Sequence, residues 1–78
     1  MSGERTEFAE VAEALGLTTA AIIVVKTRPE RLLIVLYRDG GEGFTETLQR
    51  NEAGVLERTG PPEPVPDIAA RIRQLVEQ

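Results

Sequence analysis

The chain has 78 residues, enough for one small domain, and 41% of them are hydrophobic while 28% are charged. This balance is typical of a folded globular protein and excludes the apolar-poor, highly charged composition of a disordered chain. A formal net charge of −4 argues against general binding to nucleic acids or anionic membranes, because such binding depends on an excess of Lys and Arg.

Two residue types that carry much of protein chemistry are missing. The sequence has no cysteine and no histidine, which excludes disulfides, thiolate metal sites and histidine-based catalysis. We therefore expect a protein that is not an enzyme and that has no catalytic, cofactor-binding or metal-binding residues. No apolar leader follows the charged N-terminus, and the longest apolar runs are too short to span a bilayer. We accordingly expect a cytoplasmic protein with no membrane partner.

The first expected element is an amphipathic helix over residues 7–15. Apolar side chains recur along it at helical spacing: Phe8, Val11, Ala12 and Leu15. Glu7, Glu10 and Glu13 fall on the opposite, solvated face. Gly16 is placed to end the helix in a left-handed conformation.

A strand is expected over residues 19–27, because four consecutive β-branched residues, 22–25, pack better on a pleated sheet than in a helix. Pro29 and Glu30 predict a tight turn into a second strand. The expected strands after the first cover residues 31–38, 44–50 and 55–59, with turns in the glycine-rich segment 39–43 and in the segment 51–54.

The proline-rich segment 60–66 predicts a stiff, extended connector, although a ligand for a proline-binding domain is an alternative. A last helix begins at Pro66 or Asp67. Its apolar stripe consists of Ile68, Ile72, Leu75 and Val76. The sequence thus predicts a single α+β domain over residues 1–78, with an N-terminal helix, an antiparallel meander of three to four strands and a C-terminal helix.

The segment from Phe8 to Thr27 also resembles a helix-turn-helix, with Leu15, Gly16 and Leu17 at the turn. This resemblance implies a DNA-binding transcriptional regulator in which Thr18 caps a recognition helix. It requires residues 18–27 to be helical, whereas the β-branched run favours a strand. The overall layout and the acidic charge resemble the small dimeric chaperones that hold secretion effectors, which implies protein binding.

The two central strands predict a homodimer interface. If Pro29 and Glu30 form a two-residue hairpin loop, five large aliphatic side chains share one sheet face: Ile23, Val25, Leu32, Ile34 and Leu36. The other face then holds Ile22, Val24, Leu33, Val35 and Tyr37, and a loop over residues 39–42 adds Phe44 and Leu48 beneath both helices. Soluble monomers seldom expose so contiguous an apolar patch.

The function predicted on this basis is that of a non-catalytic protein-interaction module acting as a homodimer, such as a small regulatory, scaffolding or chaperone-like subunit. Its expected partners are a second copy and another protein, with no cofactor. The helix-turn-helix regulator is the alternative. A monomer with its helices on opposite sheet faces is the alternative to the dimer.

Overall fold

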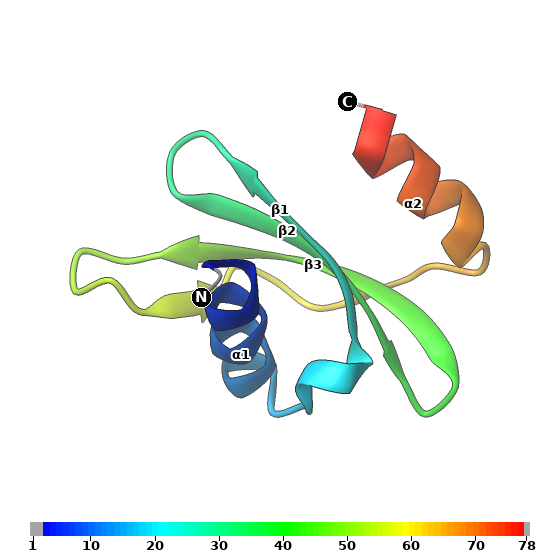
Figure 1. Ribbon diagram of the computed structural model, residues 1–78, viewed down its shortest axis with the longest axis horizontal. Coiled ribbons are helices and arrows are strands. Elements are labelled where there is room, and N and C mark those ends of the chain that lie inside the picture. The colour runs from blue at the N-terminus through cyan, green and yellow to red at the C-terminus, as the bar shows by residue number, and fades with distance from the viewer. Residues whose placement is uncertain (1–2, 78) are drawn as a thin grey trace.

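An antiparallel sheet separates two helices in the computed structural model, which describes residues 3–77 (Figure 1). The elements in chain order are α1 (Gly3–Leu15), the 3-10 helix η1 (Thr19–Ala21), β1 (Ile22–Arg28), β2 (Leu32–Asp39), β3 (Glu42–Arg50), β4 (Leu56–Arg58), β5 (Glu63–Pro64) and α2 (Ile68–Glu77). The sheet order is β1-β2-β3-β4, and β5 also pairs with β3. This arrangement confirms the predicted α+β fold with a helix at each end of the chain.

The first helix buries the predicted apolar stripe and ends where the sequence indicated. Val11, Ala12 and Leu15 are buried against the sheet. Gly16 has a φ of 73°, and the Leu17 amide donates to the Ala12 carbonyl at 2.8 Å. A left-handed glycine with this reverse hydrogen bond is a common helix terminus.

The strand after α1 starts later than the sequence suggested. Residues 19–21 form one turn of 3-10 helix, and the strand begins at Ile22. The β-branched run therefore adopts the extended conformation expected of it. Because residues 22–28 are β1, the second helix that the helix-turn-helix resemblance requires is not formed.

The β1–β2 hairpin differs from the prediction by one residue. Arg28 pairs with Leu32, so the loop contains three residues, 29–31. Glu30 and Arg31 both adopt left-handed backbone angles, with φ of 67° and 65°. The two-residue loop was therefore wrong, and the added loop residue shifts the register of β1 against β2 by one.

This shift exchanges side chains between the two faces of β1. Val25 pairs with Val35 and packs with the α1 core, whereas Val24 pairs with Leu36 and packs with the α2 core. A β-bulge between Ile22 and Val24 then restores Ile22 to the α1 side. The predicted faces of Val24 and Val25 are thus interchanged, as a one-residue slip dictates.

The β2–β3 register is the predicted one. Asp39 pairs with Glu42 across Gly40 and Gly41, which have φ of 66° and 85°. The hairpin loop is tighter than the four residues expected, but the same pairs face each other along the strands. Phe44 and Leu48 accordingly join the core on the α1 side.

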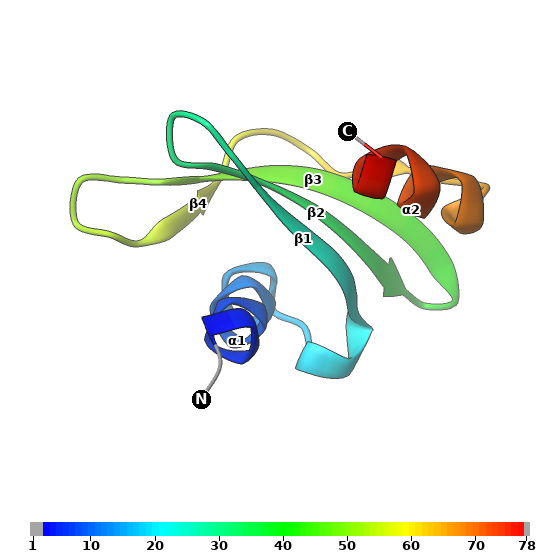
Figure 2. The ribbon, with the colours of Figure 1, turned by 45° about the horizontal axis from the view of Figure 1, so that its top comes forward.

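The two helices lie on opposite faces of the sheet, α1 below and α2 above in Figure 2. The prediction that both helices cover one face was therefore wrong, and the observed placement of the helices is the one expected for the monomer alternative. The core under α1 consists of Val11, Ala12, Leu15, Ile22, Leu33, Val35, Tyr37, Leu48 and Leu56. The core under α2 is smaller and consists of Leu36, Val65 and Leu75, with partly buried Ile23, Val24, Ile34, Ile68 and Ile72 around it.

An extended segment leads from β4 to α2. The Val65 amide donates to the Gly43 carbonyl at 2.8 Å, and the Val65 side chain is buried. Any side chain at position 43 would collide with Ile68, so glycine there permits the close approach of α2 to β3. Asp67 caps the helix through a hydrogen bond from the Ala70 amide at 3.1 Å. In the part of the chain described, no helix has the length and hydropathy to cross a membrane.

Candidate interaction surface

Four of the five residues predicted for the dimer interface lie on one sheet face. Ile23, Ile34 and Leu36 pack with the α2 core, and the alternation along β2 places Leu32 on the same face. Val25 lies on the opposite face. Leu36 has no exposed surface, whereas Ile23, Leu32 and Ile34 are half-buried.

The second helix covers this face only in part. Leu75 is the buried residue of α2, while Ile68 and Ile72 are half-buried and Val76 is 70% exposed. The C-terminal end of the helix is held at β1, where the Lys26 ammonium group donates to the Leu75 carbonyl at 2.6 Å. The apolar stripe of α2 therefore continues past the part of the sheet that it covers.

The hydrogen-bond ladder determines which backbone groups of β1 face outward. The Arg50 amide donates to the Arg31 carbonyl at 3.0 Å, so odd-numbered positions of β2 bond to β3 and even-numbered positions bond to β1. The β1 partners of these even-numbered residues are Val24, Lys26 and Arg28. The amides and carbonyls of Val25 and Thr27 consequently point away from the sheet, along an edge that pairs with no strand of residues 3–77.

The opposite edge of the sheet has a different construction. β4 and β5 have three and two residues, and they cover the two ends of β3. Pro64 lies within β5 and the exposed Pro61 and Pro62 precede it, so this edge offers few amide donors. Short strands and prolines are devices that keep a sheet edge from pairing with other chains.

A buried polar cluster lies at the β3–β4 end of the α1 core and was not foreseen from the sequence. The Glu46 side chain is fully buried and accepts two hydrogen bonds of 3.0 Å from the Arg58 guanidinium. The Tyr37 hydroxyl donates to the same carboxylate at 2.6 Å. Glu46 lies two residues after Phe44 and two before Leu48, so it points to the same core face of β3 as these two residues. This spacing is the one feature of the sequence that could have indicated a buried carboxylate.

The cluster changes the acidity of its tyrosine. Burial raises the pKa of Tyr37 to about 12, and the hydrogen bond and negative charge of Glu46 act in the same direction. A phenol that stays protonated to high pH serves as a hydrogen-bond donor and not as a base. Glu46 is therefore a structural carboxylate whose charge is balanced by Arg58.

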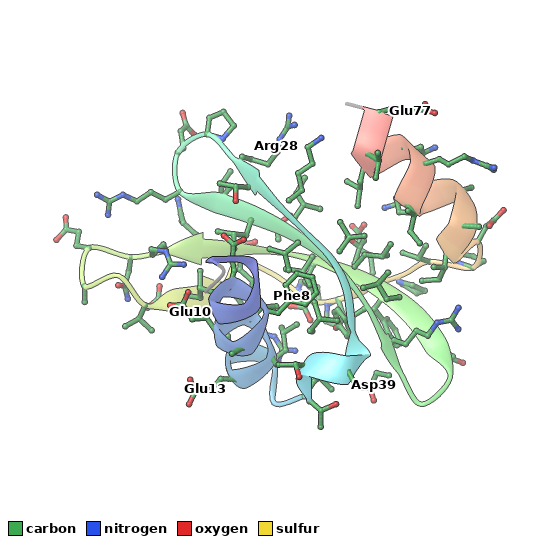
Figure 3. All side chains as sticks on the ribbon, in the orientation of Figure 1. Phe8, Glu10, Glu13, Arg28, Asp39 and Glu77 are labelled. Carbon is green, nitrogen blue, oxygen red and sulfur yellow. The ribbon has the colours of Figure 1, made fainter. Side chains whose placement is uncertain are left out.

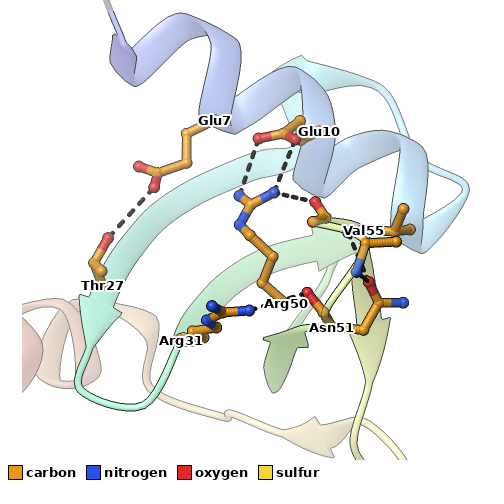
Figure 4. Close-up of polar contacts among 9 residues, drawn as sticks. Glu7, Glu10, Thr27, Arg31, Arg50, Asn51 and Val55 are labelled. Atoms are coloured by element: carbon orange, nitrogen blue, oxygen red, sulfur yellow. Dashed lines mark hydrogen bonds and ion pairs between the residues drawn. The ribbon is translucent and has the colours of Figure 1, made fainter.

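A second ion pair joins α1 to the sheet (Figure 4). The Arg50 guanidinium donates to both oxygens of Glu10 at 3.1 Å and to the Gly54 carbonyl at 2.6 Å. The hydrogen bond from Arg50 lowers the pKa of Glu10. On the same helix, Glu7 accepts a hydrogen bond of 3.3 Å from the Thr27 hydroxyl of β1. These contacts position α1 against the sheet.

Among the side chains that the structure describes, those of residues 7–77, no group of three or more acidic residues is placed to hold a metal ion. The chain matches no protein-family model, and searches of curated proteins and of solved structures find no match either.

Proposed function

We propose that the protein is a non-catalytic protein-interaction module that works as a homodimer, with β1 as the strand that meets the second copy. One observation carries this proposal: the sheet has one long edge that is open and one that is closed. β1 presents the outward backbone groups of Val25 and Thr27, whereas the other edge consists of two short strands and a proline-rich segment. An open strand edge is a template for pairing with another strand.

The difference between the edges favours a closed dimer over an open polymer. Pairing β1 of one copy with the opposite edge of the next would leave free edges at both ends and would continue without limit. Because that opposite edge is blocked, pairing of β1 with itself is the remaining arrangement, and it is complete with two copies. A domain of this size also gains from the additional buried surface.

The structure of the carboxylates supports a role without catalysis. Glu46 and Glu10 are each held by a bidentate arginine, Arg58 and Arg50, which joins elements of the fold. Among the described side chains, every buried polar atom has a hydrogen-bond partner. These two carboxylates therefore serve to hold elements of the fold together.

Light scattering behind size-exclusion chromatography tests the proposal. The expected mass is twice the 8.5 kDa of the chain. Thr27→Pro removes an outward amide without removing a bond to β2, and we expect it to yield a folded monomer. Thr27→Ala is the matched control, because it also loses the hydroxyl contact to Glu7 but keeps the amide. A wild-type chain that is monomeric at high micromolar concentration would overturn the proposal.

A further inference from the structure

We infer that the two copies pair through β1 about a two-fold axis at Val25, and that Val76 at the overhanging end of α2 becomes buried in the same interface. This inference rests on the proposed function and specifies how the second copy binds. Three observations carry it: the outward backbone groups of β1, the position of its cation, and an exposed apolar side chain beside it.

The outward backbone groups of β1 and the charge of Lys26 determine the register in which the two β1 strands pair. An axis at Lys26 would place two ammonium groups directly opposite each other, which is unfavourable in a sheet. An axis at Val25 places Lys26 opposite Val24 of the partner subunit. It also uses the outward amide and carbonyl of Val25 for two hydrogen bonds between the copies. The bulge at Ile23 and the proline at position 29 limit the new ladder to the middle of the strand.

Val76 is one of two large hydrophobic residues that are mostly exposed within the described chain, with 70% of its surface accessible. The preceding residue, Leu75, is bound to Lys26 of β1 through its carbonyl, so this end of α2 lies at the open edge. In Figure 3, Arg28 at the end of β1 and Glu77 at the end of α2 lie toward the same side of the molecule. The other exposed residue, Val55, is in the β3–β4 connection, three strands away from this edge.

Two-fold symmetry brings the ends of the α2 helices together. An axis through an antiparallel pair and perpendicular to the sheet keeps α2 of both copies on the same face. Each α2 end then flanks the new ladder beside the half-buried Ile23 and Val24 of the β1 strands. The occupant of this surface is therefore a second copy, because one symmetric contact satisfies the strand edge and covers the valine together.

Cross-linking tests the register. The chain contains no cysteine, so Val25→Cys introduces a single thiol. Facing residues of a hydrogen-bonded antiparallel pair have Cα atoms about 5.5 Å apart, but their Cβ atoms are slightly too far apart for an unstrained disulfide. A short thiol-specific bifunctional cross-linker should therefore convert most of the Val25→Cys protein to a covalent dimer on a denaturing gel. Val55→Cys is the control and should remain a single chain.

Paired substitutions test the role of α2. We expect Val76→Arg to raise the dissociation constant of the dimer about tenfold or more, because each of the two copies loses a buried valine side chain. Val55→Arg makes the same change at the other exposed valine and should alter the constant less than about twofold. Circular dichroism melts establish that both variants are folded.

The outcomes separate this inference from the proposed function. A monomeric wild type overturns both. If the wild type is a dimer but the Val25→Cys protein fails to cross-link, or the two arginine variants dissociate alike, the Val25 axis and the part played by Val76 are overturned. The homodimeric module would then stand with a different interface.

Discussion

At the scale of single residues, the buried cluster of Tyr37, Glu46 and Arg58 is the main departure from an apolar core. A buried carboxylate is costly unless it is paired and hydrogen-bonded, and here three donor contacts satisfy Glu46. The sequence places Glu46 on the core face by its spacing from Phe44 and Leu48. It could not show that Arg58, twelve residues later, would reach the carboxylate, because that contact depends on the β3–β4 pairing.

We expect Arg58→Met to lower the free energy of unfolding by about 3 kcal/mol, because it leaves the buried Glu46 carboxylate without its cation. The triple variant Tyr37→Phe, Glu46→Leu, Arg58→Met should recover most of this loss, since all three polar groups are then replaced by apolar ones. Urea denaturation at one protein concentration measures both. A single variant as stable as the wild type would show that the ion pair contributes little.

The pKa of Tyr37 predicts a loss of stability in alkali. The folded-state pKa of about 12 lies above the ordinary value of 10, so the folded state binds the phenolic proton more tightly. This contribution is fully present below pH 10 and disappears as the pH rises to about 12. Denaturation midpoints across this range should fall more steeply for the wild type than for Tyr37→Phe. Parallel pH profiles of the two proteins would contradict this role for Tyr37.

At the scale of elements, the sequence predicted the strands better than their pairing. The β-branched run and the glycine-rich turn identified β1, β2 and the β2–β3 register, because these depend on local conformation. The β1–β2 register depends on whether Arg31 belongs to the loop or to β2. Arg31 adopts a left-handed backbone conformation in the loop, which arginine does not favour, so the sequence did not indicate it. An amphipathic pattern also shows that α2 has one apolar face, but it does not determine which side of the sheet receives it.

The β1–β2 loop stores strain that glycine should relieve. Glu30 is exposed and has a φ of 67°, a conformation that costs a residue with a Cβ roughly 1–2 kcal/mol. Glycine also increases the entropy of the unfolded chain, which offsets part of the relieved strain. Glu30→Gly should therefore raise the free energy of unfolding by about 0.5–1 kcal/mol. Glu52→Gly is the control, because this exposed turn residue has no positive φ. Equal or lower stability of Glu30→Gly in urea denaturation would contradict the prediction.

At the scale of the whole molecule, the proposed dimer depends on the difference between the two edges of one sheet. The opposed helices leave less of the predicted apolar face open than the sequence suggested, since α2 covers Leu36 and part of Ile34. The open edge of β1 takes the place of that face as the basis for association. No local sequence pattern indicates this edge, because the strand order and the proline-rich segment of the far edge together create it.

Amide hydrogen exchange at Val25 and Thr27 tests directly whether β1 pairs with a second copy, because the amides of these residues point outward from the strand. Both amides point away from β2, so nothing in the isolated sheet of residues 3–77 binds them. In a dimer joined through β1 about an axis at Val25, the Val25 amide forms a hydrogen bond to the second copy, whereas Thr27 faces the bulge at Ile23 of the partner subunit. We expect protection of the Val25 amide close to that of Val24 and Lys26, lost on dilution below the dissociation constant. Rapid exchange of Val25 at high micromolar concentration, beside protected Val24 and Lys26, would contradict a dimer joined through β1.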